Sequence, residues 1–157
     1  MTKFKIISWA LKILIGCQLV SIAVTMCIIY QIQDYAYNPP DFIKKISINL
    51  LLTCVYTVGL YFTHQSCTLF LKKGYFNTQS ALYLTKGGYI IMAKAVLSLV
   101  KVAIFIDLHK EPMALVKDIS SSTTFDIMLF IIGFSLVALS DIIKKGEIIK
   151  TENDLTV

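Results

Sequence analysis

The sequence predicts an all-α fold: an integral membrane four-helix bundle with both termini cytoplasmic and short interfacial helices in the connections. Three observations lead to this prediction. Of 157 residues, 56% are hydrophobic and only 16% are charged, which is too apolar for an ordinary soluble domain. Four long apolar runs are each close to the roughly 20 residues that cross a hydrocarbon core. One of these runs contains Lys94 and Lys101, and charges at such a depth must face protein or water.

The four apolar runs form a single predicted domain, residues 1–157. We expect spans at about residues 10–31, 46–71, 88–106 and 124–143, followed by a cytoplasmic tail at 144–157. The first run lacks the small-residue cleavage site that follows a secretory signal, so we expect it to remain as a span. The runs leave no room for a separate soluble domain.

The connections are predicted from helix-breaking residues and capping patterns. We expect Gly74, Gly87 and Gly88 to separate the second span from the third, with a short interfacial helix between them. Pro112 is predicted to open another short surface helix. Thr123–Asp126 has the T-x-x-D pattern of a helix start directly before the fourth span.

The lysines predict the orientation. The net charge of +5 arises without any arginine, and we assign it to topology and anionic headgroups rather than to nucleic acid. One side of the membrane is predicted to carry Lys3, Lys5, Lys12, Lys72, Lys73, Lys86, Lys144, Lys145 and Lys150, and the other only Lys44, Lys45, Lys110 and Lys117. By the positive-inside rule, both termini and the middle connection face the cytoplasm.

Polar residues recur at helical spacing within each apolar run. These stripes are Gln18/Ser21/Thr25, Asn49/Thr53/Thr57, Lys94/Ser98/Lys101 and Ser135/Ala138/Asp141. Small and hydroxyl residues are the usual packing surface between membrane helices. The alternative is that the stripes line a wet interior.

The intramembrane charges Lys94, Lys101, Asp126 and Asp141 are the candidate site residues. Depth along the helices favours the pairs Lys94–Asp141 and Lys101–Asp126. Lys144 and Lys145 are rival partners for Asp141, and Asp126 has an alternative role as a capping acid. Both structural pairing and functional use remain open for the two lysines.

The sequence gives no indication of an enzyme, a cofactor or a metal site. It contains no nucleophile elbow, phosphate-binding glycine loop or clustered carboxylate pair. His64 has no second ligand at metal-binding spacing, and we interpret it as a packed or interfacial histidine. The four cysteines form no C-x-x-C and are interpreted as small core residues: Cys17, Cys27, Cys54 and Cys67.

Two motifs resemble a known family. Gly74-Tyr75-Phe76-Asn77, then Leu82 or Leu84 and Gly87-Gly88, is similar to the G-x-F…L…G pattern of the bacterial family domain of unknown function 2975. The carboxyl end is similar to that family's G-x-x-L-x-x-E-x-D-L-T ending through Gly146, Ile149, Glu152, Asp154, Leu155 and Thr156. Ile149 replaces the leucine, and lysines replace frequent arginines. The resemblance implies an uncharacterised multi-pass protein of the bacterial cytoplasmic (inner) membrane, often encoded beside a small helix-turn-helix regulator.

Two functions follow as hypotheses. The first is a non-catalytic interaction or regulatory protein whose cytoplasmic connection and tail bind a partner such as that regulator, without binding nucleic acid directly. The alternative is a small transporter or ligand-binding bundle with a polar interior around Lys94 and Lys101.

Overall fold

A computed structural model describes residues 2–33, 40–74, 76–105 and 112–155. In these residues the chain forms four α-helices and no strand: α1 (Thr2–Gln33), α2 (Pro40–Lys73), α3 (Thr78–Ile104) and α4 (Pro112–Leu155). Each helix contains a segment long and apolar enough to cross a membrane. The prediction of an all-α chain with four helices able to span a membrane is therefore confirmed.

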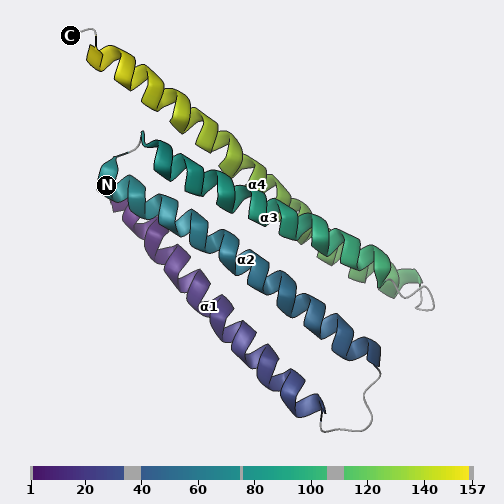
Figure 1. Cartoon of the computed structure of the whole chain (residues 1–157). Helices are drawn as coiled ribbons and strands as arrows, with labels where there is room; N and C mark the ends of the chain where they lie inside the picture. Colours follow the sequence, from purple (N-terminus) through teal and green to yellow (C-terminus); the bar gives the residue numbers. More distant parts are fainter. Residues whose placement is uncertain (1, 34–39, 75, 106–111, 156–157) are drawn as a thin grey trace.

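The helices pack in chain order. Among the described residues α1 packs on α2, α2 on α3 and α3 on α4, and no other pair of helices approaches closely. Figure 1 shows the start of α1, the turn between α2 and α3 and the end of α4 at the same end of the molecule. The last turns of α4 extend past the start of α3.

The predicted short interfacial helices are wrong as separate elements. Residues 78–86 are the first turns of α3, which continues through Gly87 and Gly88 without a break. Likewise α4 runs unbroken from Pro112, so Thr123–Asp126 lies inside a helix rather than at its start. The capping role considered for Asp126 is therefore excluded.

Glycines set the close contacts between helices. A Cβ atom built on Gly88 would lie 2.7 Å from the carbonyl oxygen of Gly133, and the reverse distance is also 2.7 Å. On the other side of α3, a Cβ on Gly87 would lie 3.0 Å from the carbonyl oxygen of Gly59. Because a membrane gives little hydrophobic driving force between helices, such close backbone approach is a main source of packing energy. The sequence motif Gly87-Gly88 is therefore a packing site and not a helix breaker.

The ends of α2 and α3 explain the turn between them. Gly74 adopts a φ of 88°, a conformation that favours glycine, and its N–H bonds the Phe70 carbonyl at 3.2 Å. Asn77 caps α3, because its side chain accepts hydrogen bonds from the N–H groups of Gln79 and Ser80. The helix that Asn77 caps is α3 itself and not a separate interfacial helix.

Helix α1 contacts its neighbour through one narrow face. The side chains that are not fully exposed recur at spacings of three and four: Phe4, Ser8, Leu11, Ile15, Gln18, Ile22, Thr25 and Ile29. The Phe4 and Phe70 rings meet edge to face with centroids 5.9 Å apart. Ser8 shares a 3.3 Å hydrogen bond with His64. His64 is thus a packed histidine, as the sequence predicted.

Candidate functional site

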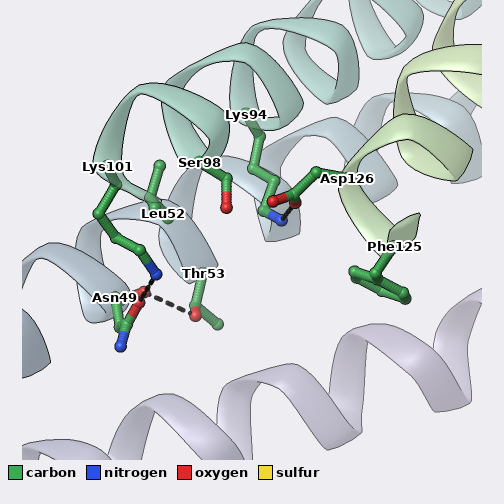
Figure 2. A pocket seen from close by; sticks show the side chains of 8 residues that line it. All are labelled: Asn49, Leu52, Thr53, Lys94, Ser98, Lys101, Phe125 and Asp126. Carbon is green, nitrogen blue, oxygen red and sulfur yellow. Dashed lines mark hydrogen bonds and ion pairs between the residues drawn. The ribbon is translucent and has the colours of Figure 1, made fainter. Parts of the chain in front are cut away.

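An ion pair joins α3 to α4 inside the helical layer. The Lys94 ammonium lies 2.8 Å from a carboxylate oxygen of Asp126, and Figure 2 shows the two side chains directed toward each other. The side chains are only 13% and 3% exposed, respectively. Lys94 also lies 5.5 Å from the centre of the Phe125 ring. Both charges are therefore neutralised within the protein.

The predicted pair Lys94–Asp141 is wrong. The contact of Gly88 with Gly133 fixes the register of the antiparallel helices, and it places Lys94 opposite Asp126. Asp141 lies 15 residues further along α4, or about 22 Å at a rise of 1.5 Å per residue. Instead, Asp141 is exposed and lies 3.3 Å from Lys144. The prediction failed because it began the fourth helix near residue 124, twelve residues after its actual start at Pro112, and so placed Asp126 at a helix end and not opposite Lys94.

The predicted pair Lys101–Asp126 is also wrong. Lys101 donates a 2.7 Å hydrogen bond to the side-chain oxygen of Asn49 on α2, as Figure 2 shows. Asp126 is instead the partner of Lys94, which lies about two turns from Lys101 along α3. Lys101 therefore has a neutral partner, whereas Lys94 has a charged one.

These residues surround a cavity of about 260 Å³ between α2, α3 and α4. Its lining is Asn49, Leu52, Thr53, Lys94, Ser98, Lys101, Phe125 and Asp126. Figure 2 shows the Ser98 hydroxyl directed into the space between the two lysines. Two of the four predicted polar stripes thus meet here.

The other two stripes do not reach the cavity. Helix α1, with Gln18, Ser21 and Thr25, does not approach α3 or α4. On α4, Ser135, Ala138 and Asp141 are exposed. The buried stripe of polar and small residues on α4 is instead Asp126, Gly133 and Ser140, spaced by seven residues. Ser140 donates a 2.9 Å hydrogen bond to the Ala81 carbonyl of α3. This seven-residue spacing is visible in the sequence and marks the buried face of α4.

A second hollow lies where the end of α4 passes the α2–α3 turn. Phe76 packs directly on Gly146, because a Cβ atom at Gly146 would overlap its ring. Next to it, Thr78 donates a hydrogen bond to Glu147. The hollow, which we call the Phe76 hollow, has a volume of about 670 Å³ and is lined by Lys73, Gly74, Phe76, Gly146, Ile149, Lys150, Asn153 and Asp154.

The structure brings four of the eight family-like motif residues to this hollow. Gly74, Phe76, Gly146 and Asp154 line it. Gly88 does not, because it packs on Gly133 in the interior between α3 and α4. Glu152 and Leu155 are exposed on the last turns of α4, and Thr156 lies outside the described residues.

The other candidate ligands in the sequence, His64 and the cysteines, do not form a metal site in the described residues. The described part of the chain contains no group of three or more His, Cys, Asp or Glu side chains placed to bind a metal ion. All four cysteines are free. Only Cys67 is buried, while Cys17 and Cys27 are exposed on α1, so the interpretation of every cysteine as a core residue is wrong for these two.

These features define a multi-pass helical membrane protein with an ion pair between its third and fourth helices. Residues 45–157 match the family model described as Protein of unknown function (DUF2975). The chain belongs to this family, which confirms the resemblance seen in its motifs. The matched region starts within α2, so α1 lies outside it. The chain matches no curated protein and no solved structure.

Proposed function

We propose that this protein is a non-catalytic interaction protein of the bacterial inner membrane. Both termini and the α2–α3 turn face the cytoplasm, and the Phe76 hollow binds a segment of a cytoplasmic protein. The partner we favour is a small helix-turn-helix regulator, which the family resemblance implies. The observation that supports this proposal is the packing of Phe76 on Gly146, because it joins two motifs separated by 70 residues into one surface.

The chemistry of the hollow indicates the partner segment it would accept. Phe76 and Ile149 offer apolar surface, and both side chains are about half exposed or more. Lys73 and Lys150 add positive charge at its rim. A partner segment with one large apolar side chain flanked by carboxylates would complement this surface, since interfaces combine a buried apolar anchor with a charged rim.

Co-purification with matched variants tests the proposal. Ile149 lines the hollow, whereas its neighbour Ile148 does not, and the two side chains are 59% and 57% exposed. Extraction in mild detergent should recover a DNA-binding regulator with the wild type and with Ile148→Glu. Recovery should fall at least tenfold with Ile149→Glu, because a carboxylate replaces an apolar anchor, worth about 2 kcal/mol in an interface. A chain lacking residues 153–157 should behave like Ile149→Glu.

Two results would contradict the proposal. One is the absence of any DNA-binding regulator from wild-type preparations. The other is equal recovery with Ile149→Glu and Ile148→Glu.

The second candidate function is ligand binding or transport within the membrane. It is supported by the cavity around Lys94 and Lys101, which combines polar groups from α2, α3 and α4. In the described part of the chain α1 contributes nothing to this cavity. A ligand site would therefore be formed by side chains from three helices, and these lining residues all lie within the region that matches the family.

A further inference from the structure

The charges around the cavity do not balance among the described residues. Lys94 and Asp126 cancel each other through their 2.8 Å contact. Lys101 contributes one more positive charge, and its hydrogen-bond partner, Asn49, is neutral. A charged group at membrane depth is costly unless it is paired or solvated. The cavity therefore favours an anion over a neutral or cationic ligand.

The hydrogen-bond donors at the cavity suit an anionic group. An ammonium has three donors, and the contact with Asn49 uses one of them. The Ser98 hydroxyl points into the same space in Figure 2, and Ser98 is only 7% exposed. An ammonium and a hydroxyl from one helix face can both donate to the oxygen atoms of one phosphate or carboxylate.

The size and depth of the cavity restrict the ligand further. A volume of about 260 Å³ is below that of typical sites for drug-sized molecules, so a small group fits best. Lys101 lies three residues before Ile104, the last residue of α3. The cavity is thus near the helix end, where a lipid phosphate or a small solute reaches a lysine without crossing the hydrocarbon core.

We propose that this cavity binds a phosphate or carboxylate group. Lys101 supplies the positive charge that contacts the group, Ser98 supplies a second hydrogen-bond donor, and the Lys94–Asp126 ion pair forms an electrically neutral part of the lining. The group belongs either to the head of an anionic lipid or to a small soluble anion. This site lies far from the Phe76 hollow and does not depend on partner binding. The proposal specifies the class of ligand for the second candidate function, which is ligand binding or transport within the membrane.

The test compares wild type with Lys101→Met and with a matched control on the same helix, Lys86→Met. Lys86 is exposed and does not line the cavity. The full-length protein is placed in nanodiscs of phosphatidylcholine alone or with phosphatidylglycerol. Bound lipid is counted by native mass spectrometry. In phosphatidylcholine discs, inorganic phosphate and acetate are titrated while the melting temperature is recorded.

If the ligand is a lipid, we expect wild type and Lys86→Met to retain phosphatidylglycerol. Lys101→Met should retain it at least about tenfold more weakly, because a charge-assisted hydrogen bond is worth about 1.5–3 kcal/mol. A soluble ligand predicts that phosphate or acetate raises the melting temperature of the same two proteins and not of Lys101→Met. If the wild type shows neither effect, the proposal is wrong, even if Lys101→Met fails to fold. Equal binding by Lys101→Met and Lys86→Met also overturns it.

Discussion

The ammonium of Lys94 lies 2.8 Å from the carboxylate of Asp126, and both groups are almost completely buried between α3 and α4. This contact distinguishes the two intramembrane lysines by the charge of their partners. Lys94 is neutralised by a carboxylate in the protein, while Lys101 is bonded to the neutral Asn49. The sequence made the two lysines look equivalent, but the structure indicates a packing role for Lys94 and leaves Lys101 as the better candidate for a ligand.

Breaking the Lys94–Asp126 pair should destabilise the protein more when one member is lost than when both are. Lys94→Met or Asp126→Leu leaves a single charge at membrane depth, at a cost of about 3 kcal/mol. The double variant leaves no charge and should recover most of that loss. Melting temperatures of the three variants in one detergent measure this coupling. Additive losses would show that the pair does not stabilise the fold.

The pair Lys144–Asp141 serves as the control for that experiment. It lies along one helix, and its side chains are 36% and 62% exposed. Exposed pairs of this kind contribute about 0–1 kcal/mol. Asp141→Leu should therefore change the melting temperature little, whereas a loss as large as that of Asp126→Leu would argue against the register between α3 and α4.

Enlarging Gly133 should separate α3 from α4. A Cβ atom at this position would lie 2.7 Å from the carbonyl oxygen of Gly88, and backbone cannot move aside as a side chain can. We expect Gly133→Val to cost about 1–3 kcal/mol, measured as a lower melting temperature and folded yield. Gly16→Val is the control, since a Cβ atom at Gly16 would have no neighbour within 4 Å. Equal losses for the two variants would contradict the glycine contact.

The number and type of helices could be predicted from the sequence, but the helix ends could not. Apolar runs of sufficient length specify spans, because hydrocarbon thickness fixes the length that a span requires. Gly87 and Gly88 were misinterpreted because glycine marks a turn in water and a close helix contact in a membrane. The sequence does not show whether these two glycines lie inside the membrane or in an aqueous connection between spans. The predicted ion pairs were wrong because the fourth helix was expected to start near residue 124, whereas α4 starts at Pro112.

The residues of the candidate site could be predicted, but their partners could not. Lys94, Lys101 and Asp126 were recognisable as charges within apolar runs. Which charges meet depends on the register between helices, and that register is set by Gly88 and Gly133. The seven-residue spacing of Asp126, Gly133 and Ser140 would have indicated the buried face of α4. Nothing in the amino-acid sequence indicated that Asn49 would be the partner of Lys101.

The orientation in the membrane remains a prediction from the lysine distribution, and cysteine labelling tests it. In a chain with its native cysteines replaced, single cysteines at Asn77 and Thr151 should react only when the cytoplasmic face is opened. Cysteines at Asn38, which lies outside the described residues, and at Ser121 should react with an impermeant reagent added outside. The physical reason is that lysine-rich short loops stay in the cytoplasm. Labelling of Asn77 from outside would reverse the orientation.

The last prediction concerns the link between the α2–α3 turn and the end of α4. Gly146→Ala adds a Cβ atom where the Phe76 ring lies. Because Phe76 is 48% exposed, its ring can swing away without disturbing the helices. The turn then loses its packing on α4 and opens more often. Trypsin should therefore cut after Lys73 about fivefold faster, as expected for a local loss of about 1 kcal/mol, while the melting temperature changes little.

Ile148→Ala provides the comparison for this cleavage assay, since Ile148 lies two residues further along α4 and does not line the Phe76 hollow. Its cleavage rate should match that of the wild type. Phe76→Ala removes the ring altogether, so it should reproduce the fast cleavage of Gly146→Ala, and combining the two changes should add nothing further, because both remove the same contact. A double variant that is cut much faster than either single variant would show that Phe76 and Gly146 act independently and that the turn is not fastened to α4 at this point.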